Sequence, residues 1–508
     1  MTAIATRARG LVPVTAATAA ALLLASAPAT AATPIPGEGS TTLAPFRGAP
    51  AVPKPIGGVP PTPQNPFMAR NGDSNVHNDA WMTDAYTRSG PLGRSPSVFS
   101  AVLGNRVCIT ITFDTRGRIV ASCVSATTGP RLYMLSPRTL DTVAELALPY
   151  KPPAAGIPPQ LNTAGGVYFY LDNRDRAVLA TTDRRIWVVE ETGGAAHPGF
   201  RKVRDYAVGR YLKGDERLPS TLPDWQGRLW FVGRQSGTVG VLNPRTGRAR
   251  TLRLREEIEN SFATAREGVY IVSDKRMYRM EADRRGAPRI VWSSRYDNSG
   301  IHKPGQIDAG SGTTPTVMTG GYVAITDNAD PMQVVVYRRA AKLRRGQRRV
   351  VCEVPVFTKG SSATENSLIA VGDSLIAENN YGYQLGVTAG GKLTAPGMAR
   401  VDVRPGGRGC RLVWTNRTVR APSVVPKASL RNGLVYTFTK DGDPGSPTAD
   451  VWSWAALDFR TGRLVWQRLA GTGGGFNNHY AGIALGPDGR TAYLGGVGGV
   501  MALRDGGS

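Results

Sequence analysis

Short runs of carboxylates, amides and one histidine recur at comparable places in several parts of the sequence. Each run stands directly before or after an apolar stretch. The runs are Glu259-Asn260-Ser261, Glu365-Asn366-Ser367, Glu378-Asn379-Asn380 and Asn478-His479-Tyr480. Carboxyl and imidazole groups exchange protons near neutral pH, and amides hydrogen-bond to hydroxyl groups. These residue types in repeated runs are typical of a site that binds or cleaves a polyhydroxylated molecule such as a sugar chain.

We assign each run an expected role from its chemistry. The expected catalytic residues are Glu365, Glu378, His479 and Tyr480. The expected substrate-binding residues are Asn366, Asn379, Asn380, Asn478, Glu259 and Asn260. Asp327 and Asn328 form a weaker candidate for a hard cation such as Ca²⁺, which prefers oxygen ligands. The competing interpretation is structural, because Asn and Asp also satisfy the backbone at strand ends.

Motif searches narrow the possible chemistry. The sequence contains no G-x-S-x-G, no H-E-x-x-H and no Walker-type run. Local motifs therefore give no support for a hydrolase with a nucleophile elbow, for a metalloprotease or for a nucleotide hydrolase.

The elements that must position these residues follow an internal repeat. A short strand, a turn containing glycine and a second β-rich strand recur eight times. The glycines of those turns are 117, 166, 227, 268, 321, 372, 433 and 489, with a mean spacing of about 53 residues. Four-stranded units at a period near 50 residues are typical of β-propeller blades. We predict an all-β fold, a propeller of eight blades over 98–508, with seven as the alternative.

Closure of the ring and the place of the site follow from the same repeat. The last unit has only three evident strands, and Val98 to Leu103 can supply the fourth, so an N-terminal strand is expected to close the ring. The first strand of each blade lines the axis and the second runs antiparallel to it. Starts of first strands and ends of second strands must then lie on one face, where the polar runs are expected to form rings around a channel mouth.

One turn carries a more specific pattern. The segment Leu457 to Trp466 reads LDFRTGRLVW, with weaker copies at Asn243 to Arg248 and Ser136 to Thr139. It resembles the repeat of the quinoprotein-like (PQQ-like) propellers, and the resemblance covers the blade pattern over roughly 98–507. The resemblance implies the propeller fold. It does not imply quinone-dependent dehydrogenation, because the adjacent active-site cysteines of those enzymes have no counterpart here.

The N-terminal region predicts export. Arg7 and Arg9 precede an apolar stretch from Leu11 to Ala27, and Ala29-Thr30-Ala31 has the spacing of a cleavage site. We expect residues 1–31 to be a signal peptide, with a membrane anchor as the alternative, and the mature protein to be extracellular. Ten prolines between 34 and 66 predict a disordered tether over 32–69. The polar segment 70–97 is a candidate cover for one channel mouth, or a surface connector.

Four cysteines suit an exported protein. The segment Arg106 to Val124 predicts a hairpin in which Phe113 opposes Arg118, and that register places Cys108 opposite Cys123. Cys352 and Cys410 then pair by elimination. The alternative is buried free thiols.

Charge constrains the partners. The 508 residues carry a formal net charge of +24, which favours an acidic polymer or an anionic surface, although an arginine-rich composition alone would also produce it. We expect the protein not to bind nucleic acid, because no binding motif accompanies the charge. We also expect no transmembrane segment and a monomeric protein. The leading interpretation is a secreted hydrolase or lyase acting on an extracellular glycan-type substrate. The alternatives are a non-catalytic binding scaffold at the cell surface and a metal-dependent, lactonase-like hydrolase.

Overall fold

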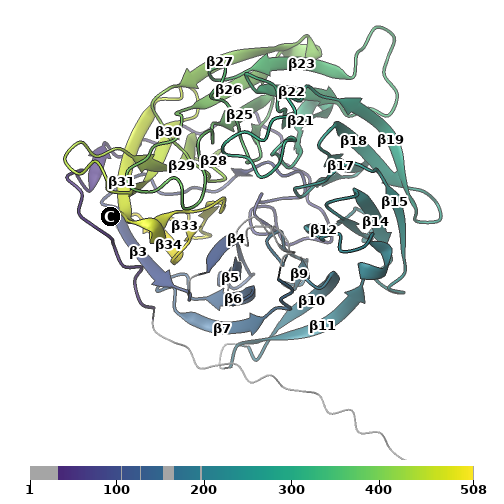
Figure 1. Ribbon diagram of the computed structural model, residues 1–508, viewed down its shortest axis with the longest axis horizontal. Helices are drawn as coiled ribbons and strands as arrows, with labels where there is room; N and C mark the ends of the chain where they lie inside the picture. The colour runs from purple at the N-terminus through teal and green to yellow at the C-terminus, as the bar shows by residue number, and fades with distance from the viewer. Residues whose placement is uncertain (1–31, 105, 126–127, 153–164, 195–196, 507–508) are drawn as a thin grey trace, which may run out of the picture.

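The computed structural model describes residues 32–104, 106–125, 128–152, 165–194 and 197–506. Eight four-stranded antiparallel sheets stand like spokes around a central axis (Figure 1). The prediction of eight blades is confirmed, and the alternative of seven is wrong. The described residues contain no α-helix, only the short 3-10 turns Gly209–Tyr211, Thr319–Gly321, Pro405–Gly407 and Gly474–Phe476. The expected signal peptide, residues 1–31, lies outside the described residues.

The strands are grouped here by blade, with the axial strand of each blade first. Blades 1 and 2 are β4 (Val107–Phe113), β5 (Ile119–Val124), β6 (Arg131–Leu135), β7 (Thr142–Ala147) and β8 (Tyr170–Leu171), β9 (Ala177–Ala180), β10 (Arg185–Thr192), β11 (Gly199–Ala207). Blades 3 and 4 are β12 (Ser220–Pro223), β13 (Leu229–Val232), β14 (Thr238–Leu242), β15 (Ala249–Arg253) and β16 (Ala263–Ala265), β17 (Gly268–Val272), β18 (Arg276–Ala282), β19 (Pro288–Arg295).

The second half of the ring repeats the plan. Blades 5 and 6 are β20 (Thr316–Met318), β21 (Tyr322–Thr326), β22 (Gln333–Arg338), β23 (Val350–Pro355) and β24 (Ile369–Val371), β25 (Ser374–Glu378), β26 (Met398–Val403), β27 (Cys410–Asn416). Blades 7 and 8 are β28 (Lys427–Ser429), β29 (Leu434–Asp441), β30 (Val451–Asp458), β31 (Leu464–Thr472) and β32 (Ala484–Leu485), β33 (Thr491–Gly496), β34 (Gly499–Arg504), β3 (Ser97–Val102).

Burial explains the pattern of the strands. The middle strands are apolar on both faces because each blade packs between two others, and every residue of β13 and β14 is buried. The outermost strands face solvent on one side, so β15 and β19 alternate between half-buried and exposed positions. The core is therefore a ring of apolar layers between the blades.

An N-terminal strand closes the ring, as the sequence predicts. Strand β3 pairs antiparallel with β34 along its whole length, from Ser97 opposite Arg504 to Val102 opposite Gly499. In Figure 1 the blue β3 lies beside the yellow C-terminal strands. Joining the two ends of the chain in one sheet removes the open edge of the last blade.

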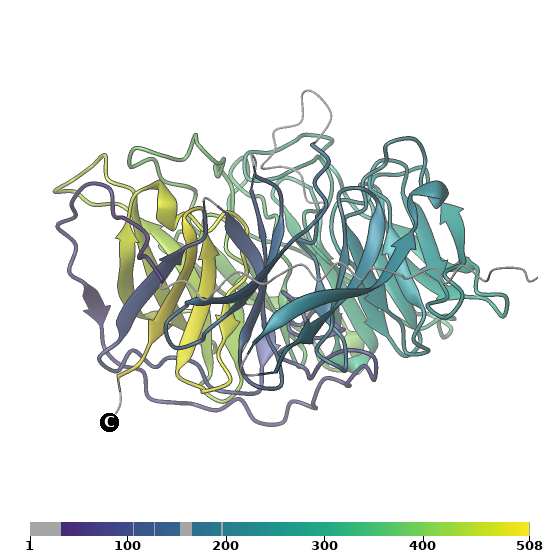
Figure 2. The same cartoon turned by 90° about the horizontal axis from the view of Figure 1, so that it is seen from below.

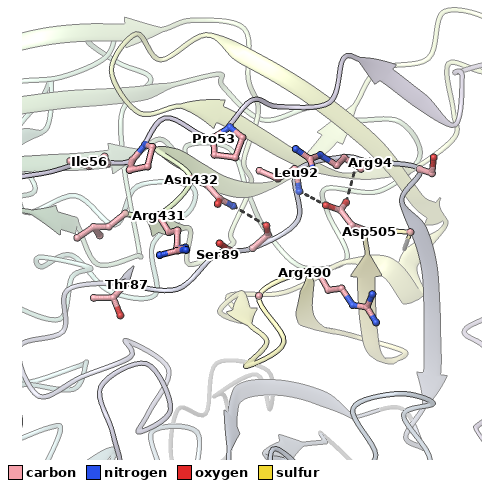
Figure 3. Close-up of a pocket in the computed structure, with 16 residues that line it drawn as sticks. Pro53, Ile56, Thr87, Ser89, Leu92, Arg94, Arg431, Asn432, Arg490 and Asp505 are labelled. Atoms are coloured by element: carbon pink, nitrogen blue, oxygen red, sulfur yellow. Dashed lines mark hydrogen bonds between the residues drawn. The ribbon is translucent and has the colours of Figure 1, made fainter. Parts of the chain in front are cut away.

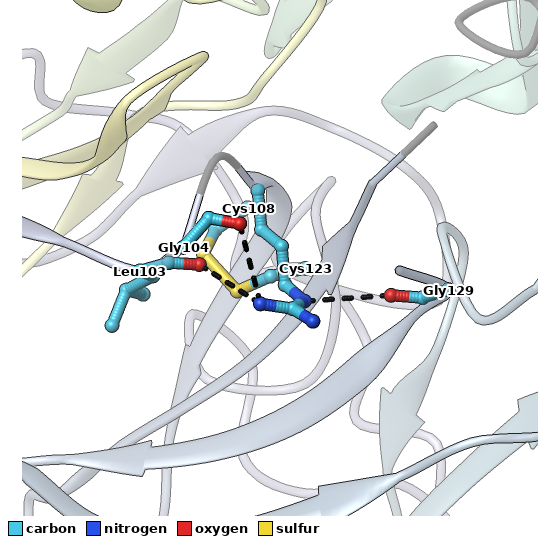
Figure 4. Close-up of a disulfide and its surroundings, with 6 residues drawn as sticks. Leu103, Gly104, Cys108, Cys123 and Gly129 are labelled. Atoms are coloured by element: carbon cyan, nitrogen blue, oxygen red, sulfur yellow. Dashed lines mark hydrogen bonds between the residues drawn. A yellow bond between two sulfur atoms is a disulfide. The ribbon is translucent and has the colours of Figure 1, made fainter. Parts of the chain in front are cut away.

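Both predicted disulfides are present, although the hairpin register of the first differs from the expected one. Phe113 lies opposite Ile119, not Arg118, and an irregularity between Cys108 and Thr110 restores Cys108 opposite Cys123. Figure 4 shows this bond beside the carbonyls of Leu103, Gly104 and Gly129, which accept hydrogen bonds from Arg106 at 3.3–3.4 Å. The second bond joins Cys352 of β23 to Cys410 of β27, and so fastens blade 5 to blade 6.

The turn that carries the family resemblance has the expected chemistry. The Asp458 carboxylate accepts hydrogen bonds from the backbone N–H groups of Arg460 and Thr461, both at 2.9 Å. Gly462 then adopts a φ of +69°, a conformation that glycine reaches without strain.

Residues 32–69 differ from the disordered tether that the prolines predict. They run along the lower face of the disc in Figure 2, and β1 (Phe46–Gly48) pairs with the outer edge of β31. Lys54, Ile56 and Ala69 donate backbone hydrogen bonds to the ring at 2.8–2.9 Å. Proline removes N–H groups but leaves the neighbouring residues free to pair, so a proline-rich chain can still lie against strand edges.

We call residues 32–69 the strap. The inner segment, residues 74–86, follows the strap and reaches the axis. Its carbonyls accept hydrogen bonds from axial strands of five different blades. The pairs are Leu171 to Ser74, Thr264 to Ala80, Val317 to Trp81, Ala370 to Thr83 and Ala428 to Asp84, at 2.7–3.0 Å. All five donors lie in the last two residues of their axial strands, next to the turns into the second strands, so these parts of the segment occupy the end of the axis opposite the expected site. Its last residues form β2 (Ala85–Tyr86), which pairs with β28.

No helix in the described part of the chain is long and apolar enough to cross a membrane.

Candidate functional site

The two Glu-Asn-Ser runs lie at equivalent positions, just before the axial strands β16 and β24. All six residues are buried, with 3–7% of their surface exposed. Each run follows the outer strand of the preceding blade and turns down into the axis. The repeat therefore brings residues about a hundred positions apart to the same end of the axis, the upper end in Figure 2.

Three carboxyl groups, those of Glu259, Asp308 and Glu365, form a carboxyl cluster near the Arg234 guanidinium at this end, with the more exposed Glu257 beside them. Arg234 Nη2 lies 3.5 Å from Glu259 Oε1 and 4.0 Å from Asp308 Oδ2, and Arg234 Nε donates to Glu257 at 2.6 Å. Glu365 Oε2 accepts the backbone N–H of Ile307 at 3.1 Å. Glu365 Oε1 and both Glu259 carboxyl oxygens have no hydrogen-bond partner among the described residues.

Burial and mutual repulsion keep protons on this carboxyl cluster. Burial raises the pKa of Glu365 to about 8, and the neighbouring Asp308 charge adds to the rise. Burial also raises the pKa of Glu259 well above its usual range, and that of Asp308. One cation in a poorly solvated place cannot hold three carboxyls ionised at once. At least one carboxyl group of the cluster is therefore protonated at neutral pH.

A second polar group surrounds Glu378 at the end of β25. Its Oε1 atom accepts the side-chain amides of Asn366 at 2.6 Å and Asn380 at 2.9 Å. Its Oε2 atom has no partner in the part of the chain that the structure describes. Burial raises the pKa of Glu378 to about 8, although the two amide bonds act in the opposite direction. Glu378 is thus a second carboxyl that stays protonated at neutral pH.

A third group combines His479 and Tyr480 with Tyr383. The Tyr383 hydroxyl lies 3.1 Å from His479 Nδ1 and donates to Asn477 Oδ1 at 2.9 Å. His479 and Tyr480 both have positive φ, +36° and +62°, which is strained for residues with side chains. Burial raises the pKa of Tyr480 far above its usual value, and the charges of Glu365, Glu259 and Glu378 add to the rise. Asn380 links Glu365 to Glu378: its Oδ1 accepts the backbone N–H of Glu365 at 2.9 Å and its Nδ2 donates to Glu378 at 2.9 Å.

The loop from residue 296 to residue 312, between β19 and β20, covers these groups. The Tyr480 hydroxyl donates to the Gly305 carbonyl at 3.3 Å, and Gly382 donates to Pro304 at 3.0 Å. The same loop contributes Asp308 and the Ile307 N–H.

Other expected site residues have mainly local partners. The Asn379 amide donates to the carbonyls of Ser361 and Pro396. Asp327 accepts hydrogen bonds from Ala329 and Gln333, and Asn328 donates to Asn298, Ile301 and Ala309. Asn478 accepts from Ser423 at 3.4 Å, and its buried Nδ2 is unpartnered within the described residues. No group of three or more His, Cys, Asp or Glu among the described residues has the arrangement to hold a metal ion.

Sequence reasoning missed several residues at the site. Arg234 follows the second strand of blade 3 at the place that Asn328 and Asn380 occupy in blades 5 and 6, but a search for carboxylates and amides passes over an arginine. Asp308 stands outside the strand-end pattern, and Tyr168 reaches in from blade 2 to donate to Asn260 Oδ1 at 2.7 Å. His77 stacks on Tyr168 with ring centroids 6.4 Å apart, and the polarity of the inner segment was a signal for it.

The lower face carries two further concave regions. A groove of about 980 Å³ lies between the strap and blades 7 and 8, where Asn432 donates to Gly90 and Asp505 accepts from Leu92 and Arg94 (Figure 3). A second pocket, of about 550 Å³, lies between the turns of blades 3 and 4. The arginines that line it are Arg228, Arg248, Arg250, Arg284 and Arg285.

Comparison with known proteins identifies propellers but no family. No protein-family model and no curated protein matches the chain. Among solved structures, Sqt1 from Chaetomium thermophilum is 13% identical, with 84% of this chain and 98% of that chain covered and a TM-score of 0.48. A streptogramin B lyase is 10% identical (80% and 97% covered, TM-score 0.39), and virginiamycin B lyase from Staphylococcus aureus is 10% identical (80% and 99%, 0.37). At this identity the likeness concerns the fold.

Proposed function

We propose that the chain is a secreted hydrolase or lyase that acts at the axial site on an extracellular, polyhydroxylated substrate of the glycan type. The two disulfides support export, because such bonds persist in oxidising compartments. The net charge of +24 favours an acidic glycan. The Asp458 turn supports the resemblance to PQQ-like propellers at the level of the fold alone.

The carboxyl cluster is the observation that carries this proposal. Buried carboxyl oxygens without partners are costly, and a folded protein keeps them where a ligand or catalysis uses them. Hydroxyl groups of a sugar are donors of the kind that Glu259 and Glu365 lack. The amide groups of Asn366 and Asn380 next to Glu378 supply further hydrogen-bonding positions on the same side of the axis.

The raised pKa values define the chemistry. A carboxyl group that keeps its proton at neutral pH can donate it to the departing oxygen of a glycosidic bond. Glu365 is the general acid in this scheme, and Glu378 is the second acid. His479, held by Tyr383, is the candidate proton acceptor, and Tyr480 orients the substrate between the two carboxyls.

The test is turnover on a panel of neutral and uronic-acid polysaccharides. Reducing ends report hydrolysis or elimination, and ultraviolet absorbance of an unsaturated product identifies a lyase. Glu365→Gln should lower kcat at least about 100-fold, because general acid catalysis contributes that much. Its melting temperature should stay within a few degrees of the wild-type value.

Glu353→Gln is the matched control, since Glu353 is exposed on the outer strand of blade 5. It should keep full activity. Full activity of Glu365→Gln and of His479→Ala on an identified substrate would remove the axial site from the mechanism.

The arginine pocket favours a second candidate function, a scaffold that binds an anionic surface. Arg248, Arg250, Arg284 and Arg285 are exposed, and none forms an ion pair with any described residue. Converging unpaired guanidinium groups suit phosphate, sulfate or carboxylate groups of a polymer. Arg250→Ala with Arg285→Ala should weaken binding to an anionic polysaccharide at least tenfold. The equivalent change at Arg344 and Arg345, on an exposed hairpin, should have little effect.

A further inference from the structure

The inner segment brings an imidazole against one of the two repeated serines. His77 Nδ1 lies 3.1 Å and 3.2 Å from the two carboxyl oxygens of Asp84, and His77 Nε2 lies 3.5 Å from Ser367 Oγ. Lys427 Nζ contacts Asp84 Oδ1 and the Val76 carbonyl. His77 and Ser367 expose 3% and 4% of their surface, and Asp84 and Lys427 are completely buried.

These contacts fix the tautomer of His77. Asp84 forms an ion pair with Lys427, so its carboxylate accepts the proton on Nδ1 of the imidazole. The Nε2 atom is then left with its lone pair, which faces the hydroxyl of Ser367. A serine hydroxyl against a histidine that a carboxylate orients is the geometry of an activated nucleophile.

We propose that Ser367 is a nucleophile for acyl transfer, with His77 as its base. The axial site would then cleave O-acyl esters of a polyhydroxylated molecule. This activity goes beyond glycosidic cleavage and does not depend on it. Asp84 and Lys427 are positioning residues, because they act on His77 and not on the substrate.

The chemical step is balanced within these groups. Ser367 Oγ attacks the ester carbonyl carbon while His77 Nε2 takes the hydroxyl proton. The carbon–oxygen bond to the sugar breaks, and His77 returns the proton to the departing oxygen. Water then enters and loses a proton to His77 as its oxygen bonds to the acyl carbon. The bond from that carbon to Ser367 Oγ breaks, the carboxylic acid leaves, and His77 returns the proton to Ser367 Oγ.

Side-chain amides are available for the oxygen that becomes negative in this step. Asn78 follows His77 in the chain, is fully buried, and its Nδ2 has no partner among the described residues. Asn260 Nδ2 is likewise unpartnered within the described part of the chain, and Asn260 bonds to the Tyr168 that stacks on His77. Buried donors of this kind stabilise an oxyanion when they are held in place before reaction.

The other repeated serine provides an internal control. Ser261 occupies the equivalent position before β16, but its hydroxyl lies 2.8 Å from the hydroxyl of Ser220 and not beside an imidazole. Ser261 therefore shares the backbone setting of Ser367 without a base. A reagent that selects activated serines should distinguish the two.

The experiment is covalent labelling with diisopropyl fluorophosphate, a small probe, followed by peptide mass spectrometry. We expect phosphorylation at Ser367 with loss of fluoride, no label in Ser367→Ala, and wild-type labelling in Ser261→Ala. His77→Gln should slow labelling at least 100-fold with circular dichroism unchanged. If His77→Gln does not fold, the double variant Asp84→Asn with Lys427→Met, which leaves no unpaired buried charge, should slow labelling and shift its pH profile, which a purely structural role would not do.

Absence of label on Ser367 in the wild-type protein, or equal labelling of Ser261 and Ser367, would overturn the inference. The labelling is independent of the proposed glycan activity. The probe contains no glycan, so absence of glycan turnover in the wild-type protein and loss of label in Ser367→Ala report on separate claims.

Discussion

The Glu-Asn-Ser runs of blades 4 and 6 share sequence, position and burial, yet they have different neighbours. In blade 4, Glu259 lies beside Arg234, Asn260 accepts from Tyr168, and Ser261 pairs with Ser220. In blade 6, Glu365 has no arginine or lysine within ion-pair distance among the described residues, Asn366 binds Glu378, and Ser367 faces His77.

The difference comes from elements outside the repeat. The inner segment supplies His77, and the loop 296–312 supplies Asp308 and the N–H of Ile307. A propeller repeat places equivalent backbone positions around an axis, and insertions and termini then decide which copy has reactive partners. Blade 6 has such reactive partners, and this distinguishes it from blade 4.

The largest expected effect is on stability and concerns the support of His77. Lys427→Met leaves the Asp84 carboxylate buried without its cation, which should cost about 3–5 kcal/mol in the free energy of unfolding. Denaturant unfolding measures the change.

The matched control for this change is the double variant Lys427→Met with Asp84→Asn. Removing both charges should recover a large part of the loss, because no unpaired charge remains. A single variant that unfolds no more easily than the double variant would show that the pair does not hold the inner segment.

The second effect concerns the covalent link between blades 5 and 6, which blade 4 lacks because all four cysteines are accounted for elsewhere. Replacing Cys352 and Cys410 by alanine should lower the free energy of unfolding by about 4 kcal/mol, against about 3 kcal/mol for Cys108 and Cys123. The longer enclosed segment, 58 residues against 15, is the reason. Equal losses, or a larger loss at the hairpin bond, would contradict this ordering.

The third effect, which is the smallest within any one pH unit, is a pH dependence to which Glu365 and Glu378 of blade 6 contribute. The pKa values of Glu365 and Glu378 rise from the ordinary 4.5 to about 8 in the folded state, so the protonated form is favoured there. Their contribution to stability is complete below about pH 4.5 and is lost as the pH rises through 8. The free energy of unfolding should fall by up to about 1.4 kcal/mol per pH unit for each carboxyl across that window.

Glu365→Gln should remove one such contribution and flatten the slope, whereas the exposed control Glu353→Gln should not. Denaturation midpoints of the wild type and both variants, measured from pH 5 to pH 8, give the slope for each protein. An unchanged slope in Glu365→Gln would mean that Glu365 is ionised in the folded protein at neutral pH.

Much of the fold could be predicted from the sequence, because each blade carries its own signals. Glycine turns, apolar runs and the LDFRTGRLVW pattern are local, so blade number, ring closure and both disulfides follow from them. The register at Phe113 was wrong by one residue, since an irregularity near Cys108 leaves no mark in the sequence. The packing of residues 32–69 also escaped prediction, because proline content reports stiffness and not contact.

The site was predictable only in part, because local signals identify residues at strand ends but not their distant partners. Strand-end periodicity brings Glu259, Glu365 and Glu378 to one end of the axis. Arg234 also stands at a strand end, in blade 3, but its residue type was not the one sought. Asp308 comes from a loop without a periodic pattern. The contact of His77 with Ser367 spans 290 residues, and no local rule foresees it.

The central claim is that carboxyl groups at the axial site keep their protons at neutral pH. Infrared difference spectroscopy tests this claim most directly. The carbonyl stretch of a protonated carboxyl should be present at pH 7, disappear as the pH passes about 8, and lose intensity in Glu365→Gln and in Glu378→Gln. A wild-type spectrum without any protonated carboxyl band at pH 7 would contradict it.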